Sequence, residues 1–310
     1  MSSSHLHSEV SRGGLSYIAS EPRESDFGLL CVHGWGCQAS DFTRLFTKLD
    51  KQGFTYQAVA VDLPGHGKSP SKVCHVPSIA AFGEQVLSLA DELGLEKVVL
   101  VGHSMGCRVV LAAWDQARHP GRSYIKALVF LDGSHYNLRP KLFAFDSSDP
   151  RSANLTESEK AAKRKEMFER MFSPNTPQVF RESCLAHLNA LDNKYATQLR
   201  LSHIDWDHQT MDPTMTKLGQ SDMRLLNLQS TDVDAENQRI PLEPGQESKW
   251  MKYVNEKVSN ATQFVVEGSA HFPHVDQPQL VANRLIEFVR LLQETKDLKA
   301  KVNSSGGNER

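Results

Sequence analysis

The chain has 310 residues, of which 39% are hydrophobic, and a formal net charge of −2 from 35 basic and 37 acidic side chains. This length and hydrophobic content suit one large globular domain, or a domain with an inserted subdomain, and they exclude a chain that is disordered throughout. The balanced charge gives no basic stripe, so we expect no nucleic-acid partner.

Sequence features that direct a protein to a membrane or bind a metal are not evident. The first residues, MSSSHLHSEVSRGG, lack the apolar segment of a secretory signal, and no apolar run near 18 residues follows. We therefore expect a cytoplasmic protein with no membrane partner. The five cysteines are scattered without Cys-x-x-Cys spacing, which predicts free thiols and no zinc site. His5 and His7 lie in a polar segment and are expected to be solvated, so no metal or other cofactor is predicted.

The first part of the chain alternates short apolar runs with segments of helical periodicity. Such runs are typical of strands buried on both faces of a parallel sheet. The alternation predicts an α/β fold with a doubly wound, mostly parallel sheet. In chain order we expect a strand at 27–33, a helix at 39–49, a strand at 57–62, a helix at 79–93, a strand at 97–101, a helix at 107–114 and a strand at 127–131.

The alternation stops after this last strand. From Pro140 to Asp222 only polar helical segments are evident, at 157–172 and 178–191, and strands resume at 223–228 and 262–266 before a helix at 279–292. The sequence therefore predicts a core of residues 1–139 and 222–294 and a helical lid insertion of residues 140–221. Residues 295–310 are expected to form a disordered tail.

A serine lies where the fifth of these elements passes into the sixth. Gly102-His103-Ser104-Met105-Gly106 follows a buried strand and precedes a helix. A strand that turns into a helix within about four residues needs glycines where a Cβ would clash, and it projects the central side chain from the sheet edge. The pattern predicts a nucleophile elbow with Ser104 as the nucleophile.

A serine nucleophile needs a base and donors for the oxyanion that develops. His271, in the loop after the strand at 262–266, is the expected base, and His274 competes with it. The backbone N–H groups of Met105 and Trp35 are the expected oxyanion donors. We also expect His33, Gly34 and His103, which flank these groups, to contact the substrate.

The acid that orients the base has several candidates. Asp234 and Asp232 fit the chain order serine, aspartate, histidine, because they follow the strand at 223–228. Asp132 ends the strand that follows the elbow helix and is the alternative acid. Sequence reasoning prefers Asp234 and leaves the choice open.

The sequence resembles α/β-hydrolase-fold proteins of the lipase, esterase and C–C hydrolase group. The residues that carry the resemblance are His33 to Gly36, Asp62 to Ser69 (DLPGHGKS), Gly102 to Gly106 and Gly268 to Pro273. They cover the predicted core and leave the insertion unmatched, where that family carries its variable lid. A serine at the elbow separates the chain from the dehalogenase and epoxide-hydrolase branches, whose nucleophile is an aspartate.

The resemblance implies a serine hydrolase acting on a small-molecule partner. The expected reaction is cleavage of an ester, lactone, thioester or C–C bond in a small to medium apolar substrate. The sequence also resembles cofactor-independent dioxygenases of the same fold, which use a His-Asp dyad with the acid at the position of Asp132. A third reading is a ligand receptor with a vestigial triad. The oligomeric state is left open.

Overall fold

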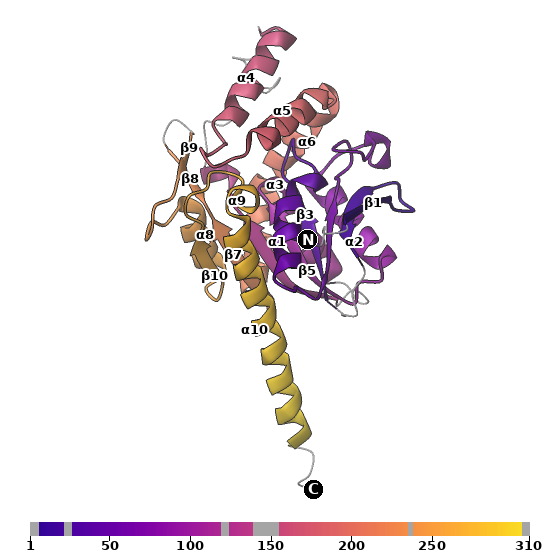
Figure 1. Ribbon diagram of the computed structural model, residues 1–310, viewed down its shortest axis with the longest axis vertical. Helices are drawn as coiled ribbons and strands as arrows, with labels where there is room; N and C mark the ends of the chain where they lie inside the picture. Colours follow the sequence, from indigo (N-terminus) through magenta and orange to yellow (C-terminus); the bar gives the residue numbers. More distant parts are fainter. Residues whose placement is uncertain (1–5, 22–26, 119–123, 139–154, 235–237, 306–310) are drawn as a thin grey trace.

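An eight-stranded sheet forms the centre of the molecule in the computed structural model, which describes residues 6–21, 27–118, 124–138, 155–234 and 238–305. The strand order is β1-β2-β4-β3-β5-β6-β7-β10 (Figure 1). All neighbouring pairs from β4 to β10 are parallel, while β1 and β2 pair in antiparallel fashion. The predicted doubly wound, mostly parallel sheet is confirmed. The strands are β1 (Leu6–Val10), β2 (Ser16–Ser20), β3 (Phe27–Val32), β4 (Gln57–Val61), β5 (Lys97–His103), β6 (Ile125–Leu131), β7 (Arg224–Gln229) and β10 (Thr262–Val265).

Helices cover both faces of the sheet, which explains the continuous apolar runs of its central strands. In β3, Leu29 and Cys31 face one buried cluster, and Leu30 and Val32 face the other. The first cluster includes α1 (Thr43–Lys51) and α10 (Pro278–Ser305). The second includes α2 (Ile79–Glu92), α3 (Met105–Ala117) and α8 (Lys249–Lys257). A strand covered on both faces has no solvent side, so it shows no polar alternation.

Short elements complete the chain around the loops of the sheet. They are η1 (Ala39–Phe42), η2 (Ser71–Val73), η3 (Tyr136–Leu138) and α9 (Pro273–Asp276). β8 (Thr231–Val233) and β9 (Arg239–Pro241) form a separate two-stranded antiparallel sheet. The sequence pattern does not predict this hairpin, which follows β7 and contains two of the candidate acids.

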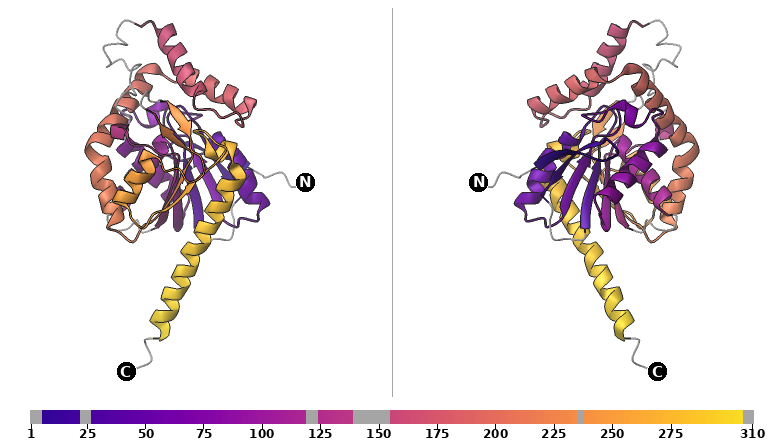
Figure 2. Two further views of the ribbon diagram at one scale, coloured as in Figure 1. Left: turned by 90° about the vertical axis from the view of Figure 1, so that its left-hand side faces the viewer. Right: turned by 90° about the vertical axis from the view of Figure 1, so that its right-hand side faces the viewer.

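The predicted lid insertion divides into two structurally different parts. Both views in Figure 2 show α4 (Glu157–Glu169) and α5 (Gln178–Ala190) above one end of the sheet. The elements that follow are α6 (Asn193–Trp206), the π-helical turn η4 (Asp207–Met211) and α7 (Asp212–Gly219). Leu199, Met211, Met215 and Leu218 of these later elements belong to the same buried cluster as α3.

This packing favours a lid that ends before α6 rather than at the predicted residue 221. Residues from α6 onward supply core side chains, whereas α4 and α5 lie above one end of the sheet. The sequence pattern misses this because helices that pack on another helix carry the same apolar periodicity as helices that cover a cavity. The start of the predicted insertion, residues 140–154, lies outside the described residues.

The predicted disordered tail also differs from the structure. Residues 295–305 continue α10, which extends beyond the body of the molecule in Figure 1. This segment contains Lys, Leu and Ala, which favour helix, and it has no proline to stop a helix already formed upstream. Residues 306–310 lie outside the described residues.

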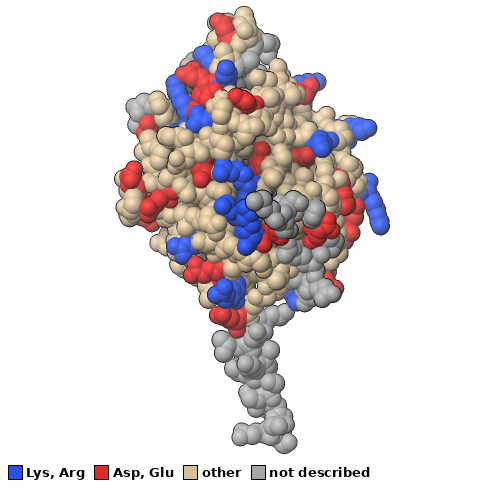
Figure 3. Space-filling model, viewed as in Figure 1, with Lys and Arg blue, Asp and Glu red and all other residues tan. Residues whose placement is uncertain are grey.

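The surface carries charges of both signs. On the face shown in Figure 3, acidic and basic side chains are interspersed over the body of the molecule. Among the residues whose placement is described, no helix combines the length and the apolar character needed to cross a membrane.

The packing of α6 generates a test of the revised boundary. Leu199→Ala should lower the free energy of unfolding by about 2–5 kcal/mol, because it opens a cavity in a close-packed core where the leucine is 0% exposed. Leu201, on the same helix, is 37% exposed, and Leu201→Ala should change stability by less than about 0.5 kcal/mol. Urea unfolding followed by circular dichroism measures both. Similar small losses at the two positions would show that α6 does not pack as part of the core, and would support the lid boundary predicted at residue 221.

Candidate active site

Ser104 occupies a strained turn between β5 and α3. Its backbone has φ 54° and ψ −114°, in the left-handed half of the map that side chains disfavour. The turn is held tightly, since a Cβ at Gly106 would lie 2.2 Å from the carbonyl oxygen of Val32. The side chain of Ser104 is only partly buried and reaches a cavity. This is the geometry of the predicted nucleophile elbow.

A hydrogen-bonded relay joins the serine to a histidine and an aspartate. The Oγ of Ser104 lies 2.9 Å from Nε2 of His271. The Nδ1 of the same ring lies 2.6 Å from Oδ2 of Asp132. In this arrangement the serine hydroxyl donates to the imidazole, and the imidazole N–H donates to the carboxylate. Such a relay allows an imidazole to remove a proton from a hydroxyl while a carboxylate stabilises the resulting imidazolium.

Asp132 is held in place by the loop that follows β7. Its side chain is 0% exposed, and Oδ1 accepts hydrogen bonds from the N–H groups of Ser230 (3.0 Å) and Thr231 (2.8 Å) and from Nε2 of Gln229 (2.9 Å). Arg239 also donates to Oδ2 through Nη1, at 2.9 Å. A buried carboxylate needs such donors, because burial without partners strongly disfavours the charge.

Sequence reasoning placed the preferred acid at Asp234, and the structure places that residue elsewhere. Asp234 lies in the β8–β9 turn, where its backbone N–H donates to the carbonyl of Gln238 and its carboxylate accepts from the N–H of Gln238. Asp232 lies within β8. Both ring nitrogens of His271 are already bonded, to Ser104 and Asp132. The alternative acid, Asp132, is therefore the one in contact with the base.

His274, the competing candidate for the base, is buried in the core packing and is not bonded to Ser104. The ring of His274 is 0% exposed and stacks on Phe42, with centroids 4.7 Å apart. Burial, together with the neighbouring His103, holds the pKa of His274 well below its usual value, so the ring is uncharged. Its position within the buried packing of α9 leaves His271 as the histidine of the relay.

Two histidines expected to contact substrate instead support the loops. His33 is 0% exposed, donates from Nδ1 to the carbonyl of Gly34, and accepts from the N–H of Leu63 at Nε2. Burial lowers its pKa to about 3, so it is neutral as these bonds require. His103 is 1% exposed and donates from Nε2 to the carbonyl of His271, at 2.7 Å. Each ring is therefore engaged with a neighbouring loop, His33 with the turn at Leu63 and His103 with the loop that carries His271.

Gly34 is a close neighbour of the serine rather than a wall of the cavity. A Cβ at this position would lie 2.9 Å from Cβ of Ser104. The absence of a side chain thus allows the turn after β3, which carries Trp35, to approach the serine. The turn itself is closed by the N–H of Cys37, which donates to the carbonyl of Gly34 at 3.2 Å.

The two expected oxyanion donors, the N–H groups of Met105 and Trp35, belong to two segments that adjoin Ser104. Met105 is the first residue of α3, and an N–H in the first turn of a helix has no partner within that helix. Trp35 lies in the turn packed against Ser104 and lines the cavity. The positive end of the helix dipole at Met105 also favours negative charge at this point.

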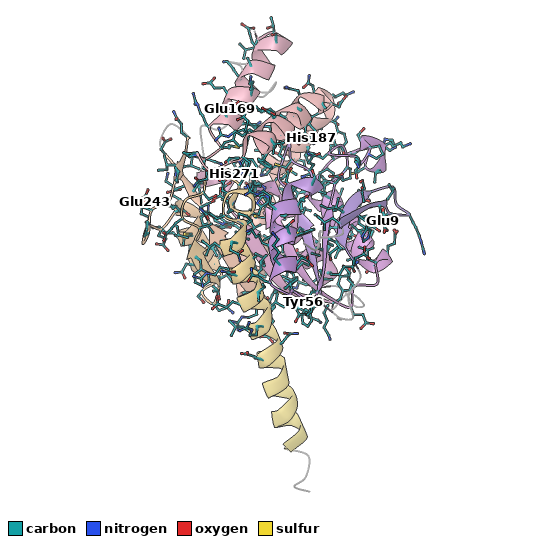
Figure 4. The ribbon with its side chains drawn as sticks, in the orientation of Figure 1. Glu9, Tyr56, Glu169, His187, Glu243 and His271 are labelled. Carbon is teal, nitrogen blue, oxygen red and sulfur yellow. The ribbon has the colours of Figure 1, made fainter. Side chains whose placement is uncertain are left out.

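A cavity opens above the relay beneath the lid helices. The empty space within it, including the part open to solvent, is about 580 Å³. Figure 4 places His271 below α4 and α5. The lining residues are Trp35, Cys37, Ser104, Met167, Phe168, Met171, Arg200, His203, Arg239, His271 and Phe272.

The lid is bonded directly to the loop that carries the histidine. The N–H of His271 donates to the carbonyl of Met171 at 3.1 Å, and the hydroxyl of Thr176 donates to Asp276 of α9 at 2.6 Å. On the other side, the N–H of Gly67 donates to Nε2 of His187 on α5, at 3.2 Å. These bonds fix the lid helices relative to the relay.

A buried ion pair between Arg108 and Asp207, which the sequence does not predict, lies next to the turn at Ser104. Arg108 of α3 donates from Nε and Nη2 to the two carboxylate oxygens of Asp207, both at 2.6 Å, and both side chains are almost fully buried. Burial would raise the pKa of Asp207, but Arg108 outweighs it and holds the pKa below the usual value. Arg108 also donates to the carbonyl oxygens of Ser104 and Ser134. No motif marks Asp207, since its segment looks like part of an irregular insertion.

No metal site accompanies the relay in the described part of the chain. There, no group of three or more His, Cys, Asp or Glu side chains is arranged to hold an ion.

Comparison with known proteins assigns the chain to a family. Residues 29–284 match the model of the alpha/beta hydrolase family. The chain therefore belongs to the alpha/beta hydrolase family.

Individual relatives agree with this assignment, and a solved structure shares the fold. A Mycoplasma pneumoniae protein named "Putative esterase/lipase 2" is 30% identical over 116 residues, which are 37% of this chain and 41% of that protein. A Haemophilus influenzae protein of the same name without the number is 25% identical over 250 residues, 76% of this chain and 74% of that one. The bromoperoxidase of Bacillus anthracis shares the fold, with a TM-score of 0.64, 18% identity, and coverage of 92% of this chain and 100% of that one. The chain spans only 41%, 20% and 30% of the first three curated relatives.

The buried pair of Arg108 and Asp207 gives a testable consequence. Arg108→Gln should lower the free energy of unfolding by about 3–5 kcal/mol, because it leaves the Asp207 carboxylate buried without its counter-charge. Arg118, at the end of the same helix, pairs with Asp115 at the surface, and Arg118→Gln should cost less than about 1 kcal/mol. Chemical denaturation of the two variants makes the comparison. Equal losses would show that the buried pair contributes no more than a surface pair.

Proposed function

We propose that this protein is an esterase-type serine hydrolase that acts through an acyl-enzyme. The observation that carries the proposal is the relay from Ser104 through His271 to Asp132 at the mouth of a cavity. The name of a relative that matches 76% of the chain, "Putative esterase/lipase", supports the same class. The cleaved bond is that of an ester, lactone or thioester, or a C–C bond next to a carbonyl, and we retain a cytoplasmic location as part of the proposal.

Each residue has a defined task in this mechanism. His271 takes the proton of the Ser104 hydroxyl as the oxygen attacks the carbonyl carbon, and later returns that proton to the leaving group. Asp132 holds the imidazole in the tautomer that accepts at Nε2 and stabilises the imidazolium. The N–H groups of Met105 and Trp35 donate to the oxyanion of the tetrahedral intermediate. Water then releases the acyl group by the same steps.

The serine is the first residue to test. Ser104→Ala should reduce turnover of a p-nitrophenyl ester by at least about three orders of magnitude and leave the fold intact, because the nucleophile is lost. The parent protein should gain the mass of one fluorophosphonate adduct, and the variant should gain none. Intact-protein mass spectrometry and steady-state kinetics measure these outcomes. A variant as active as the parent would exclude covalent catalysis by this serine.

A second candidate function uses the same cavity for different chemistry. In cofactor-independent dioxygenases of this fold, which the sequence resembles, a His-Asp dyad has its acid after the strand that follows the elbow helix. Asp132 ends β6, the strand after α3, and is the residue bonded to His271. In that reaction His271 removes a proton from a hydroxylated heteroaromatic substrate, and Ser104 donates a hydrogen bond to it.

The two functions agree on the acid and differ on the serine. Asp132→Asn should lower either activity by about three to four orders of magnitude, because an amide favours the wrong imidazole tautomer. Asp234→Asn, in the β8–β9 turn, should leave activity within a few-fold of the parent. Ester hydrolysis and oxygen consumption are measured in both variants, with circular dichroism as the control for folding. A larger loss at Asp234 than at Asp132 in folded proteins would contradict the assignment of the acid.

Ser104→Ala and the oxygen consumption of the parent together separate the two chemistries. Loss of ester hydrolysis together with retained oxygen consumption on a hydroxylated heteroaromatic substrate would favour the dioxygenase. Loss of ester hydrolysis with no oxygen consumption in the parent would favour the hydrolase.

A further inference from the structure

The residues that line the cavity fall into two chemical groups. One group is apolar and consists mainly of aromatic and methionine side chains: Trp35, Met167, Phe168, Met171 and Phe272. The other group is basic and consists of Arg200, His203 and Arg239. No Asp or Glu is among the described residues that line the cavity. The division suggests a ligand with one apolar part and one part of negative charge.

Arg239 brings a buried cation to the cavity. Its side chain is 4% exposed, and Nη1 donates to Oδ2 of Asp132 at 2.9 Å and to Oγ1 of Thr231 at 2.8 Å. Its Nε is buried without a hydrogen-bond partner in the described part of the protein. A buried donor left unsatisfied costs free energy, which a ligand oxygen near the guanidinium would reduce.

Arg200 brings a second guanidinium from another element. It comes from α6, and its Cζ lies 5.5 Å from the ring centroid of Trp35. This contact places the group over the aromatic wall, on the residue that also carries a proposed oxyanion donor. The two arginines thus reach the same cavity from α6 and from β9, so a bound ligand would meet both.

The charges decide which ligand suits these groups. An uncharged apolar ligand would offer no acceptor to Nε of Arg239 and no counter-charge to the two guanidinium groups that line the cavity. A ligand cation would meet like charge. A carboxylate would replace the lost water with charge-assisted hydrogen bonds, and the planar guanidinium matches its two oxygens. The nearby carboxylate of Asp132 is already shared among His271, Arg239 and the β7 loop.

We propose that the substrate is an amphipathic organic anion. Its apolar body packs against the side chains of Trp35, Phe168 and Phe272. Its carboxylate lies within reach of Arg200 and Arg239. The inference rests on the proposed function because it concerns the same site, and it changes the expected apolar substrate into one with a charged end.

Binding of a matched pair of ligands tests the charge without any chemistry. Isothermal titration of the Ser104→Ala protein with 4-phenylbutyrate and with 4-phenylbutyramide compares a carboxylate with a neutral group of similar shape. The carboxylate should bind at least about tenfold more tightly, which corresponds to about 1.4 kcal/mol. Adding Arg200→Gln should reduce the ratio to within a few-fold, and adding Arg200→Lys should preserve most of it.

A surface arginine supplies the control for total charge. Arg44 is exposed on α1, and Arg44→Gln in the same background should leave the ratio unchanged. Equal affinities for the two ligands, no binding of the carboxylate at millimolar concentration, or a preference that survives Arg200→Gln would overturn the inference. A preference for the carboxylate, together with a parent protein that hydrolyses no ester, would contradict the hydrolase proposal and leave this inference standing. Ester turnover by the parent without a preference for the carboxylate would overturn this inference and leave the hydrolase proposal standing.

Discussion

The carboxylate of Asp132 is the charge on which the geometry of the site depends. It has no contact with solvent, so its charge is kept only by the donors that the surrounding chain directs at it. Those donors come from the loop after β7, from β9 and from the imidazole of His271. The His271 ring is bonded to this carboxylate through Nδ1 and to Ser104 through Nε2. The position of the ring relative to Ser104 therefore depends on the position of Asp132.

The same constraint explains what the chain after β7 contributes. The loop runs past the carboxyl end of β6, and its N–H groups at Ser230 and Thr231 point to Asp132. It then turns into the β8–β9 hairpin, which returns Arg239 to the same carboxylate. The loop that chain order suggested as the source of the acid thus supplies the donors for an acid on the neighbouring strand.

Much of the fold could be predicted because its signals are local. The strands from β3 to β7 and the elbow at Ser104 follow from apolar runs and glycines whose meaning depends on their immediate neighbours. His271 could be placed because it follows the last strand closely. The acid could not be chosen, since Asp132 ends one predicted strand and Asp234 follows another. The β8–β9 hairpin, which places Asp234 in a turn away from His271, is not evident in the sequence.

Other failures have the same origin in long-range packing. The sequence gives no sign that Arg108 and Asp207 meet, because 99 positions separate them and neither lies in a motif. Likewise, α6 and α7 resemble lid helices until their apolar faces are seen to join the core. His33 and His103 adjoin the motifs in sequence, yet their buried rings are hydrogen-bonded to neighbouring loops of the chain.

The left-handed backbone of the relay has a consequence for how the protein can change. Among the residues that the structure describes, Ser104 and Asp132 are the non-glycine residues with positive φ, at 54° and 46°. Such conformations cost about 1–3 kcal/mol each, and glycine would relieve much of that strain. Selection for stability alone would therefore remove the hydroxyl and the carboxylate from these positions. Under the proposed function, their presence in this chain sets stability against chemistry at the two ends of one hydrogen-bonded relay.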